Sequence, residues 1–383
     1  MQKSRYIYYL VVVLALLTAC NSSKKLLEQG AYYQSVLAAV DKLQKNPKNK
    51  KSQEVLRKAY PLAVQDMLNE IKKAKSNAVE MPWTHIADTY QALNTMYEAI
   101  NASPKARQLI RNPKEYYRQY ADVKEKAASE QYSAGERALR KNTREDAKEA
   151  YYFFQNADAF QPGYLDVDKK LREAKEAATL KVIVEAVPVP SRYFKVSADF
   201  FYDQVDKHLR NLMNRNQFLA FYTEKDARRI GLKNPDQVLI FQFEDFSVGQ
   251  SKAFQKEETI TRDSVEVGEV EMEDGSKKPV LGTVSAKLIT RRLEVLSGGI
   301  LSMTINDGYH DTRIYRDEVP GEFLWFAEWG TYKGDVRALN EEQQKICNRI
   351  EVTPPIPQDL FVEFTKPIYD QLTAKLSRYY QNI

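Results

Sequence analysis

The sequence predicts a multi-domain protein in which an α-helical half precedes a mixed α/β half. Residues 30–180 are rich in Ala, Lys, Glu, Leu and Tyr, and their apolar residues recur at helical spacing. From Leu180 onward, β-branched runs alternate with helical stretches, which favours a sheet with helices packed on it. With 383 residues, 43% of them hydrophobic, the chain is long enough for two cores.

The composition narrows the range of partners. The 57 Lys and Arg residues nearly balance the 52 Asp and Glu residues, so the charge does not select nucleic acid as a partner. Two cysteines make no disulfide framework, and three histidines fill few metal sites.

The first twenty residues have the layout of an export signal. Lys3 and Arg5 precede an apolar run over residues 6–17, which is shorter than the ~20 residues that a permanent span needs. The tail Leu17-Thr18-Ala19-Cys20 resembles the lipobox of bacterial lipoproteins. This resemblance implies a signal peptide over residues 1–19 and acylation of Cys20. A plain signal peptide or an uncleaved anchor is the alternative.

The residues after Cys20 bear on where the protein is held. Asn21 stands where an aspartate would resemble an inner-membrane retention signal, and no acidic run follows that would resemble the surface-export tag of Bacteroidota lipoproteins. By resemblance, residues 20–29 form a tether to the outer membrane, and the body of the protein lies on the periplasmic side.

Two apolar stripes predict helices in residues 30–180. The members of the first are Leu56, Tyr60, Val64, Met67 and Ile71; those of the second are Trp83, Ile86, Tyr90, Leu93 and Tyr97. Steps of three and four residues place each set on one helix face, which we interpret as core packing. Pro61 is expected to kink the first helix or to mark its start.

A spaced set of small residues, an aromatic residue and a proline recurs in the same region. The three occurrences are Ala150, Phe154, Ala157 and Pro162; Ala92, Met96, Ala99 and Pro104; and a looser set, Gly30, Tyr32, Ser35, Ala39 and Pro47. The first two sets resemble the second helix of tetratricopeptide repeats. The resemblance implies a curved helical array with a concave partner-binding face, or a spacer that holds the second half away from the membrane.

Residues 181–353 predict a mixed α/β domain. Strands are expected over residues 181–189, 218–222 and 238–243, with helices over 197–214 and from the capping pattern at Thr223 to about Ile230. This strand–helix order resembles the periplasmic domain of curli-secretion channel lipoproteins and the amino-terminal domain of TolB.

The rest of this half predicts hairpins and a final helix. Asp274-Gly275 and Ser297-Gly298-Gly299 are expected to be tight turns. The alternation over residues 265–272 suits an exposed hairpin, or a hairpin of an oligomeric membrane channel. A capping pattern at Asn340 opens a short helix, and residues 354–383 hold the C-terminal helix. Its apolar stripe is Leu360, Phe364, Ile368, Leu372, Leu376 and Tyr379, and Pro367 is expected to kink it.

No common catalytic motif is present in the sequence, so we expect no enzyme activity, cofactor, metal or catalytic residue. Asp307, His310 and Asp311 are expected to form a loop cluster, and Cys347 a packed thiol rather than a nucleophile. Trp325 and Trp329 are either core residues or contacts for a partner. Asp263-Ser264-Val265 resembles the O-glycosylation acceptor of exported Bacteroidota proteins, which makes Ser264 a candidate modification site.

Together these features are similar to the tetratricopeptide-containing outer-membrane lipoproteins of Bacteroidota. We expect a non-enzymatic, periplasm-facing scaffold that binds other envelope proteins in an assembly or secretion machine. Two alternatives stay open, namely a subunit of an oligomeric curli-channel-like secretion complex and an envelope glycan hydrolase. The first predicts ring-shaped particles, and the second predicts two facing carboxylates in a cleft.

Overall fold

The computed structural model describes residues 23–76, 80–189, 191–273 and 275–381, and the description below is limited to them. The chain divides into two compact units, with the division between Ala178 and Thr179. Each unit is described by itself. None of the described helices is both long and apolar enough to cross a lipid bilayer.

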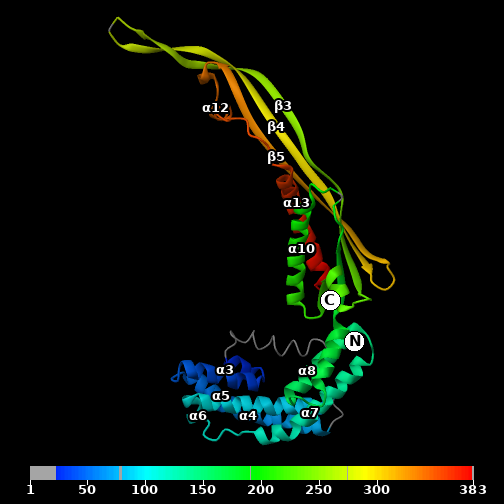
Figure 1. Ribbon diagram of the computed structural model, residues 1–383. Helices are drawn as coiled ribbons and strands as arrows, with labels where there is room; N and C mark the ends of the chain where they lie inside the picture. The colour runs from blue at the N-terminus through cyan, green and yellow to red at the C-terminus, as the bar shows by residue number, and fades with distance from the viewer. Residues whose placement is uncertain (1–22, 77–79, 190, 274, 382–383) are drawn as a thin grey trace. The chain divides into compact units, whose positions relative to one another are not determined.

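The first unit is helical. Its described helices are α2 (Ser23–Glu28), α3 (Tyr32–Lys45), α4 (Lys50–Ser76), α5 (Pro82–Ala102), α6 (Pro104–Leu109), α7 (Tyr117–Leu139), α8 (Arg144–Phe160) and α9 (Val167–Ala178). Helices α3, α4 and α5 pack on one another, and α5, α7, α8 and α9 continue the series (Figure 1). Such packing between neighbours in the chain is typical of helical arrays.

Both predicted apolar stripes lie on helices, and most of their residues are buried in the core of the first unit. Leu56, Met67 and Ile71 are buried on α4, while Tyr60 and Val64 pack at the margin of the same core. On α5, Ile86, Tyr90 and Leu93 are buried, and Trp83 packs beside them. Pro61 lies inside α4, so it does not mark the start of that helix. A proline in this place removes one helical N–H donor.

The second helical core is formed by α7, α8 and α9. Ala150, Phe154 and Ala157 are buried on α8, which ends at Phe160, two residues before Pro162. A Cβ atom on Gly135 of α7 would lie 2.7 Å from the Phe154 ring, so the glycine lets the two helices approach closely. The repeat positions therefore carry helix packing, while their assignment to the tetratricopeptide family stays a prediction.

The second unit contains a mixed five-stranded sheet in the order β2-β1-β3-β4-β5. Its strands are β1 (Leu180–Ala186), β2 (Leu219–Thr223), β3 (Gln237–Glu271), β4 (Lys277–Asp307) and β5 (Arg313–Gly334). Strand β1 is parallel to β2 and β3, whereas β3, β4 and β5 are antiparallel. The chain thus contains helices and a mixed five-stranded sheet, which confirms the predicted mixed α/β class.

Two of the helices of this unit, α10 (Lys195–Arg215) and α13 (Pro357–Tyr380), cover the end of the sheet at which β1 pairs with β3. The other helices of this unit are α11 (Glu224–Ile230), α12 (Glu341–Cys347) and the 3-10 helix η2 (Val336–Ala338). Helices α10 and α13 pack on each other and on the core strands (Figure 1). The predicted α13 stripe is buried from Leu360 to Leu376, and Pro367 lies inside the helix.

Two helix starts match the predicted capping patterns. The hydroxyl of Thr223 accepts a hydrogen bond from the backbone N–H of Asp226 at the start of α11. Asn340 and Gln343 form a reciprocal capping box at the start of α12. Each side chain satisfies a backbone donor that the helix itself leaves unpaired.

The predicted turn at Ser297-Gly298-Gly299 is wrong, because these residues lie inside the continuous strand β4. A Cβ atom on Gly299 would lie 2.6 Å from the Cβ of Phe246 on β3, so the glycine permits a close approach between strands. A glycine in a sequence can therefore mark a close approach between strands as well as a turn.

Strands β3 and β4 extend into a long hairpin beyond the covered part of the sheet (Figure 1). Of the predicted turn at its end, Asp274 lies outside the described residues, and Gly275 has a φ of +78°. Residues 266–272 are exposed on the single chain, as in either of the two predicted kinds of hairpin. We call the part of the sheet formed by residues 250–296 of β3 and β4, with residues 322–334 of β5, the ribbon.

Candidate functional site

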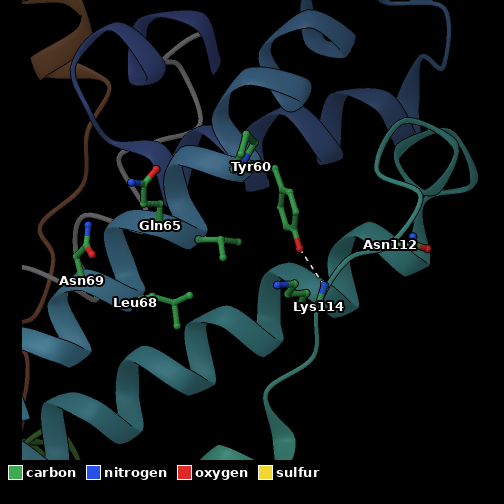
Figure 2. Close-up of a pocket in the computed structure, with 8 residues that line it drawn as sticks. Tyr60, Gln65, Leu68, Asn69, Asn112 and Lys114 are labelled. Atoms are coloured by element: carbon green, nitrogen blue, oxygen red, sulfur yellow. Dashed lines mark hydrogen bonds between the residues drawn. The ribbon is translucent and has the colours of Figure 1, made fainter.

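A shallow groove of about 420 Å³ lies on the first unit between α4 and the segment before α7. Figure 2 shows Tyr60, Gln65, Leu68 and Asn69 of α4 on one side, with Asn112 and Lys114 on the other. Val64 is half-buried, and Leu68 is 36% exposed. The groove therefore combines apolar surface with polar groups along its margin.

Two hydrogen bonds hold the wall of this groove in place. The hydroxyl of Tyr60 accepts from the backbone N–H of Lys114 at 3.0 Å (Figure 2). Two residues later, the backbone N–H of Tyr116 donates to Oδ1 of the buried Asn94 at 2.6 Å. The Tyr116 ring is buried and stacks on that of Tyr90. The segment that carries Asn112 and Lys114 is thus anchored to α4 and α5.

The polar side chains of the groove suit an extended peptide. Gln65 and Asn69 are one turn apart on α4, and Asn112 lies across from them; all three are exposed. An amide side chain offers both a donor and an acceptor, which is the pair of groups that a peptide backbone presents. The ammonium of Lys114 adds three donors and a positive charge. Amide groups on both sides of the groove and an ammonium nearby are chemically suited to hydrogen bonds with a peptide backbone and to a carboxylate.

The sequence did not point to this groove. Its Tyr60 and Val64 belong to a stripe that predicted core packing, and they do pack at the margin of the core. One sequence feature could have indicated the groove. Leu68 is an apolar residue four positions after Val64, and it does not belong to the core stripe. The approach of Asn112 and Lys114 depends on non-local contacts, which no local pattern reveals.

The aromatic segment Phe323–Trp329 lies on β5, at the edge of the sheet. The predicted site residues Trp325 and Trp329 are half-buried and face the same side of the strand. In the register of the sheet, Trp325 lies opposite Val295 and Trp329 opposite Arg291. Neither tryptophan belongs to a buried core, whereas Phe323 of the same segment packs against the core of the second unit.

Exposed apolar side chains occupy the opposite face of the same segment. Leu324 is 44% exposed and Phe326 is 52% exposed. The Arg292 guanidinium lies 4.3 Å from the centre of the Phe326 ring, a cation–π contact. On β4, Leu296 lies opposite Leu324 and is also exposed. The ribbon therefore presents an apolar patch on this face.

Ser264 lies at an irregularity of the exposed hairpin. The register of β3 shifts between Arg262 and Val265, and Ser264 adopts a left-handed φ of 59°. Beside it, Oδ1 of Asp263 accepts a hydrogen bond from the Thr283 hydroxyl at 2.6 Å. Ser264 is exposed, as a glycan acceptor has to be, and its modification stays a prediction. Cys20, the predicted lipidation site, lies outside the described residues.

Asp307 and His310 form the loop cluster that was predicted, and Asp311 accepts a hydrogen bond from the side chain of Asn306. Oδ1 of Asp307 accepts from the backbone N–H groups of Tyr309 and His310 and lies 3.0 Å from the His310 ring nitrogen. These backbone bonds are the main reason that the pKa of Asp307 is lowered. Across the described residues, no three His, Cys, Asp or Glu side chains gather in a way that suits a metal ion.

Cys347 is half-buried on α12 and packs beside the small core around Leu288. Burial raises the pKa of its thiol, which disfavours the thiolate that a nucleophile needs.

The sequence matches no known family model, and a search of curated proteins finds no match for it.

Proposed function

We propose that this protein is a lipid-anchored scaffold of the bacterial outer membrane, held on the periplasmic side through Cys20. In this proposal its helical unit is a tetratricopeptide-like array, and it binds other envelope proteins in an assembly or secretion machine without catalysing a reaction. The export signal and the lipobox resemblance support the anchoring. Several buried acyl chains make such anchoring stable.

The observation that carries the proposal is the groove on α4. Its apolar surface around Val64 and Leu68 provides contact area, and its amide groups provide backbone partners. A partner segment binds there in an extended form, with its carboxylate near Lys114. Because the lipid confines the scaffold to a plane, it raises the local concentration of the groove for partners in the same membrane.

Photo-crosslinking in the membranes of the native host tests the groove. The full chain carries a photoreactive amino acid in place of Asn69, and mass spectrometry identifies the crosslinked products. We expect crosslinks to a segment of another envelope protein, and we expect Leu68→Asp to remove them because it places a charge on the apolar surface. Lys114→Glu should weaken them because it repels the carboxylate.

Leu62 provides the matched control. It is another exposed leucine of α4, 40% exposed, but it does not line the groove. Leu62→Asp should leave the crosslinks unchanged, and a photoreactive residue in its place should not form them. Absence of crosslinks from position 69, or equal crosslinks from both positions, would contradict the groove as the binding site.

Fractionation tests the anchor separately. With Cys20→Ser, the chain is not acylated, and we expect it to leave the outer-membrane fraction. Retention of this variant with the outer membrane would contradict anchoring through Cys20 without bearing on the groove.

A further inference from the structure

Helix α2 belongs to the body of the helical unit from its first residue. It packs on α3 and α4. Ser23, where α2 begins, is 4% exposed, and its carbonyl accepts a hydrogen bond from the hydroxyl of the buried Ser35 on α3 at 2.7 Å. Leu26, in the middle of α2, is 5% exposed. The start of α2 therefore has a fixed place beside α3 and α4.

The proposed lipid site is close to this start along the chain. Cys20 precedes Ser23 by three residues, and an extended chain advances at most about 3.6 Å per residue. The two residues therefore lie within about 11 Å of each other. Acyl chains on Cys20 are buried in the bilayer, so the lipid headgroups lie close to α2 and to the surface of the unit around it.

The surface around α2 is strongly basic. Residues 23–28 of α2 and residues 50–58 of α4 contain six exposed cationic side chains and two carboxylates, a net charge of +4. The whole chain carries +5, so these fifteen residues hold most of its excess charge. We call the six cations the basic surface; they are Lys24, Lys25, Lys50, Lys51, Arg57 and Lys58.

The two segments of the basic surface lie together. The hydrogen bond and the charge of Lys58 lower the pKa of Glu54 on α4, and the charge of Lys24 on α2 adds to this effect. Lys24 and Glu54 are thus near each other across the two helices. The cations of α4 are three or four residues from Glu54, so they share its exposed side of the helix.

The stability of α4 does not explain the position of these charges. Lys50 and Lys51 lie in the first turn of α4, which contains no acidic residue. The N-terminus of a helix carries a partial positive charge, so cations in the first turn are unfavourable for the helix. An anion beside this turn would be attracted both by the two lysines and by the helix end. Phospholipid headgroups supply anions of this kind, and the acyl chains of Cys20 place them nearby.

We propose that the basic surface of α2 and α4 lies against the membrane and binds the phosphate groups of anionic phospholipids. The short connection to Cys20 brings the surface to the headgroups, and opposite charges keep it there. The acyl chains anchor the protein, while the basic surface sets how the helical unit is oriented on the bilayer. This inference rests on the proposed acylation of Cys20 and is independent of the groove.

Amine labelling of the full lipidated chain on vesicles tests the contact. One set of vesicles is phosphatidylcholine, and the other contains equal parts of phosphatidylcholine and the anionic phosphatidylglycerol. A water-soluble reagent labels exposed lysines, and mass spectrometry gives the rate at each position. We expect Lys50, Lys51 and Lys58 to be labelled about fivefold more slowly on the anionic vesicles. Lys169, exposed on α9, should be labelled at the same rate on both.

A charge-reversed variant tests whether the basic surface causes this protection. Lys50→Glu, Lys51→Glu and Arg57→Glu together should make the labelling rate of Lys58 equal on the two kinds of vesicle, because the anionic headgroups then repel the surface. Glutamates suit the positive end of α4, so this variant should keep its fold, which circular dichroism checks. High salt should abolish the protection in the parent chain too, since it screens exposed charges.

The matched control reverses two lysines and one arginine on α9, which packs on α8 at the other end of the series of helices. Lys169→Glu, Arg172→Glu and Lys175→Glu together should leave the protection of Lys58 unchanged. Loss of protection in both variants would overturn the proposal, because the net charge of the chain would then be responsible rather than the basic surface.

The same mass spectra separate this inference from the proposed anchor, since they show whether Cys20 is acylated. An acylated chain in which Lys50, Lys51 and Lys58 are labelled equally on both kinds of vesicle would overturn this inference and leave the anchor intact. A chain without acyl groups would overturn the anchor and this inference together.

Discussion

We call the part of the sheet on which α10 and α13 pack, including residues 301–305 of β4, the base. The base and the ribbon share strands β3, β4 and β5 but are stabilised differently. At the base, Leu301, Met303 and Ile305 of β4 are fully buried beneath α10 and α13. In the ribbon, η2 covers β4 and α12 covers β5 at one place, beside a small core around Leu288. Antiparallel strands tolerate water on their faces because their backbone groups are satisfied by the neighbouring strand. Strand length here is therefore set by pairing, and local stability is set by the helices that cover the strand.

Among the substitutions that test this comparison, removal of a buried ring from the base should lower the free energy of unfolding most. Phe361 of α13 is fully buried, with ring centres 4.9 Å from Phe364 and 5.4 Å from Phe194. Phe361→Ala leaves a cavity, and we expect the free energy of unfolding of this unit to fall by about 4 kcal/mol. Hydrogen exchange of α13 and β3 in increasing urea measures it.

The exposed ribbon residue Phe254 gives the control for that loss. Phe254→Ala should change the same free energy by less than about 0.5 kcal/mol, since surface residues contribute little. Similar losses for both variants would mean that the base and the ribbon do not differ in stability.

A substitution in the small ribbon core should have an intermediate and local effect. Leu288 is 1% exposed and packs with Ala338 and Leu339, next to η2. We expect Leu288→Ala to cost about 2–3 kcal/mol and to speed hydrogen exchange in the ribbon. Exchange in α10 and α13 should stay unchanged. If those helices exchange faster too, the ribbon and the base unfold as one.

The cap of α12 should contribute less. The Asn340 side chain accepts a hydrogen bond from the backbone N–H of Gln343 at 2.9 Å. In return, the backbone N–H of Asn340 donates to the side-chain oxygen of Gln343. Asn340→Ala should destabilise α12 by about 1 kcal/mol, seen as faster exchange of that helix. Lys345→Ala, an exposed change on the same helix, should have no such effect, and equal effects would argue against a role for the cap.

The smallest effect should appear on acidification of the ribbon. Hydrogen bonds from the side chain and backbone of Arg337 lower the pKa of Asp335 to about 2, and Arg337 also donates to the carbonyl of Glu266 on β3. Since the folded pKa lies below the unfolded value of about 3.9, this stabilisation is complete above about pH 4. It is lost as the pH falls through about 2.

Pepsin digestion between pH 4 and pH 2 measures this loss. We expect cleavage of the ribbon near η2 to increase as the pH falls in the parent chain. In Asp335→Asn, cleavage should already be raised at pH 4 and should change less with pH. The same pH dependence in both chains would exclude Asp335 as the group responsible.

The parts of the fold that the sequence predicted well are those with local causes. The stripes of α4 and α13 repeat with the helical period, and Thr223 and Asn340 cap helices with their own side chains. The strands of the ribbon were predicted as separate pieces, because Gly298 and Gly299 read as a turn. Their place inside β4 follows from contacts with β3 and β5, which are distant in sequence.

The candidate surfaces also have parts that the sequence predicted and parts that depend on contacts between distant segments. The aromatic segment that contains Trp325 and Trp329 was visible in the sequence, but its position on a regular edge strand was not. The groove escaped prediction because Lys114 approaches Tyr60 through the anchoring of Tyr116 on Asn94.

The sequence by itself determined the helical half, the mixed sheet class, the capped helices and the buried face of the last helix, because side-chain periodicity and capping act over a few residues. The tertiary structure decided the length of β3 and β4, the place of β5 at the end of the strand order and the groove beside α4. Those features arise when segments far apart in the chain pair their backbones or pack together, and local patterns carry no record of which segments meet.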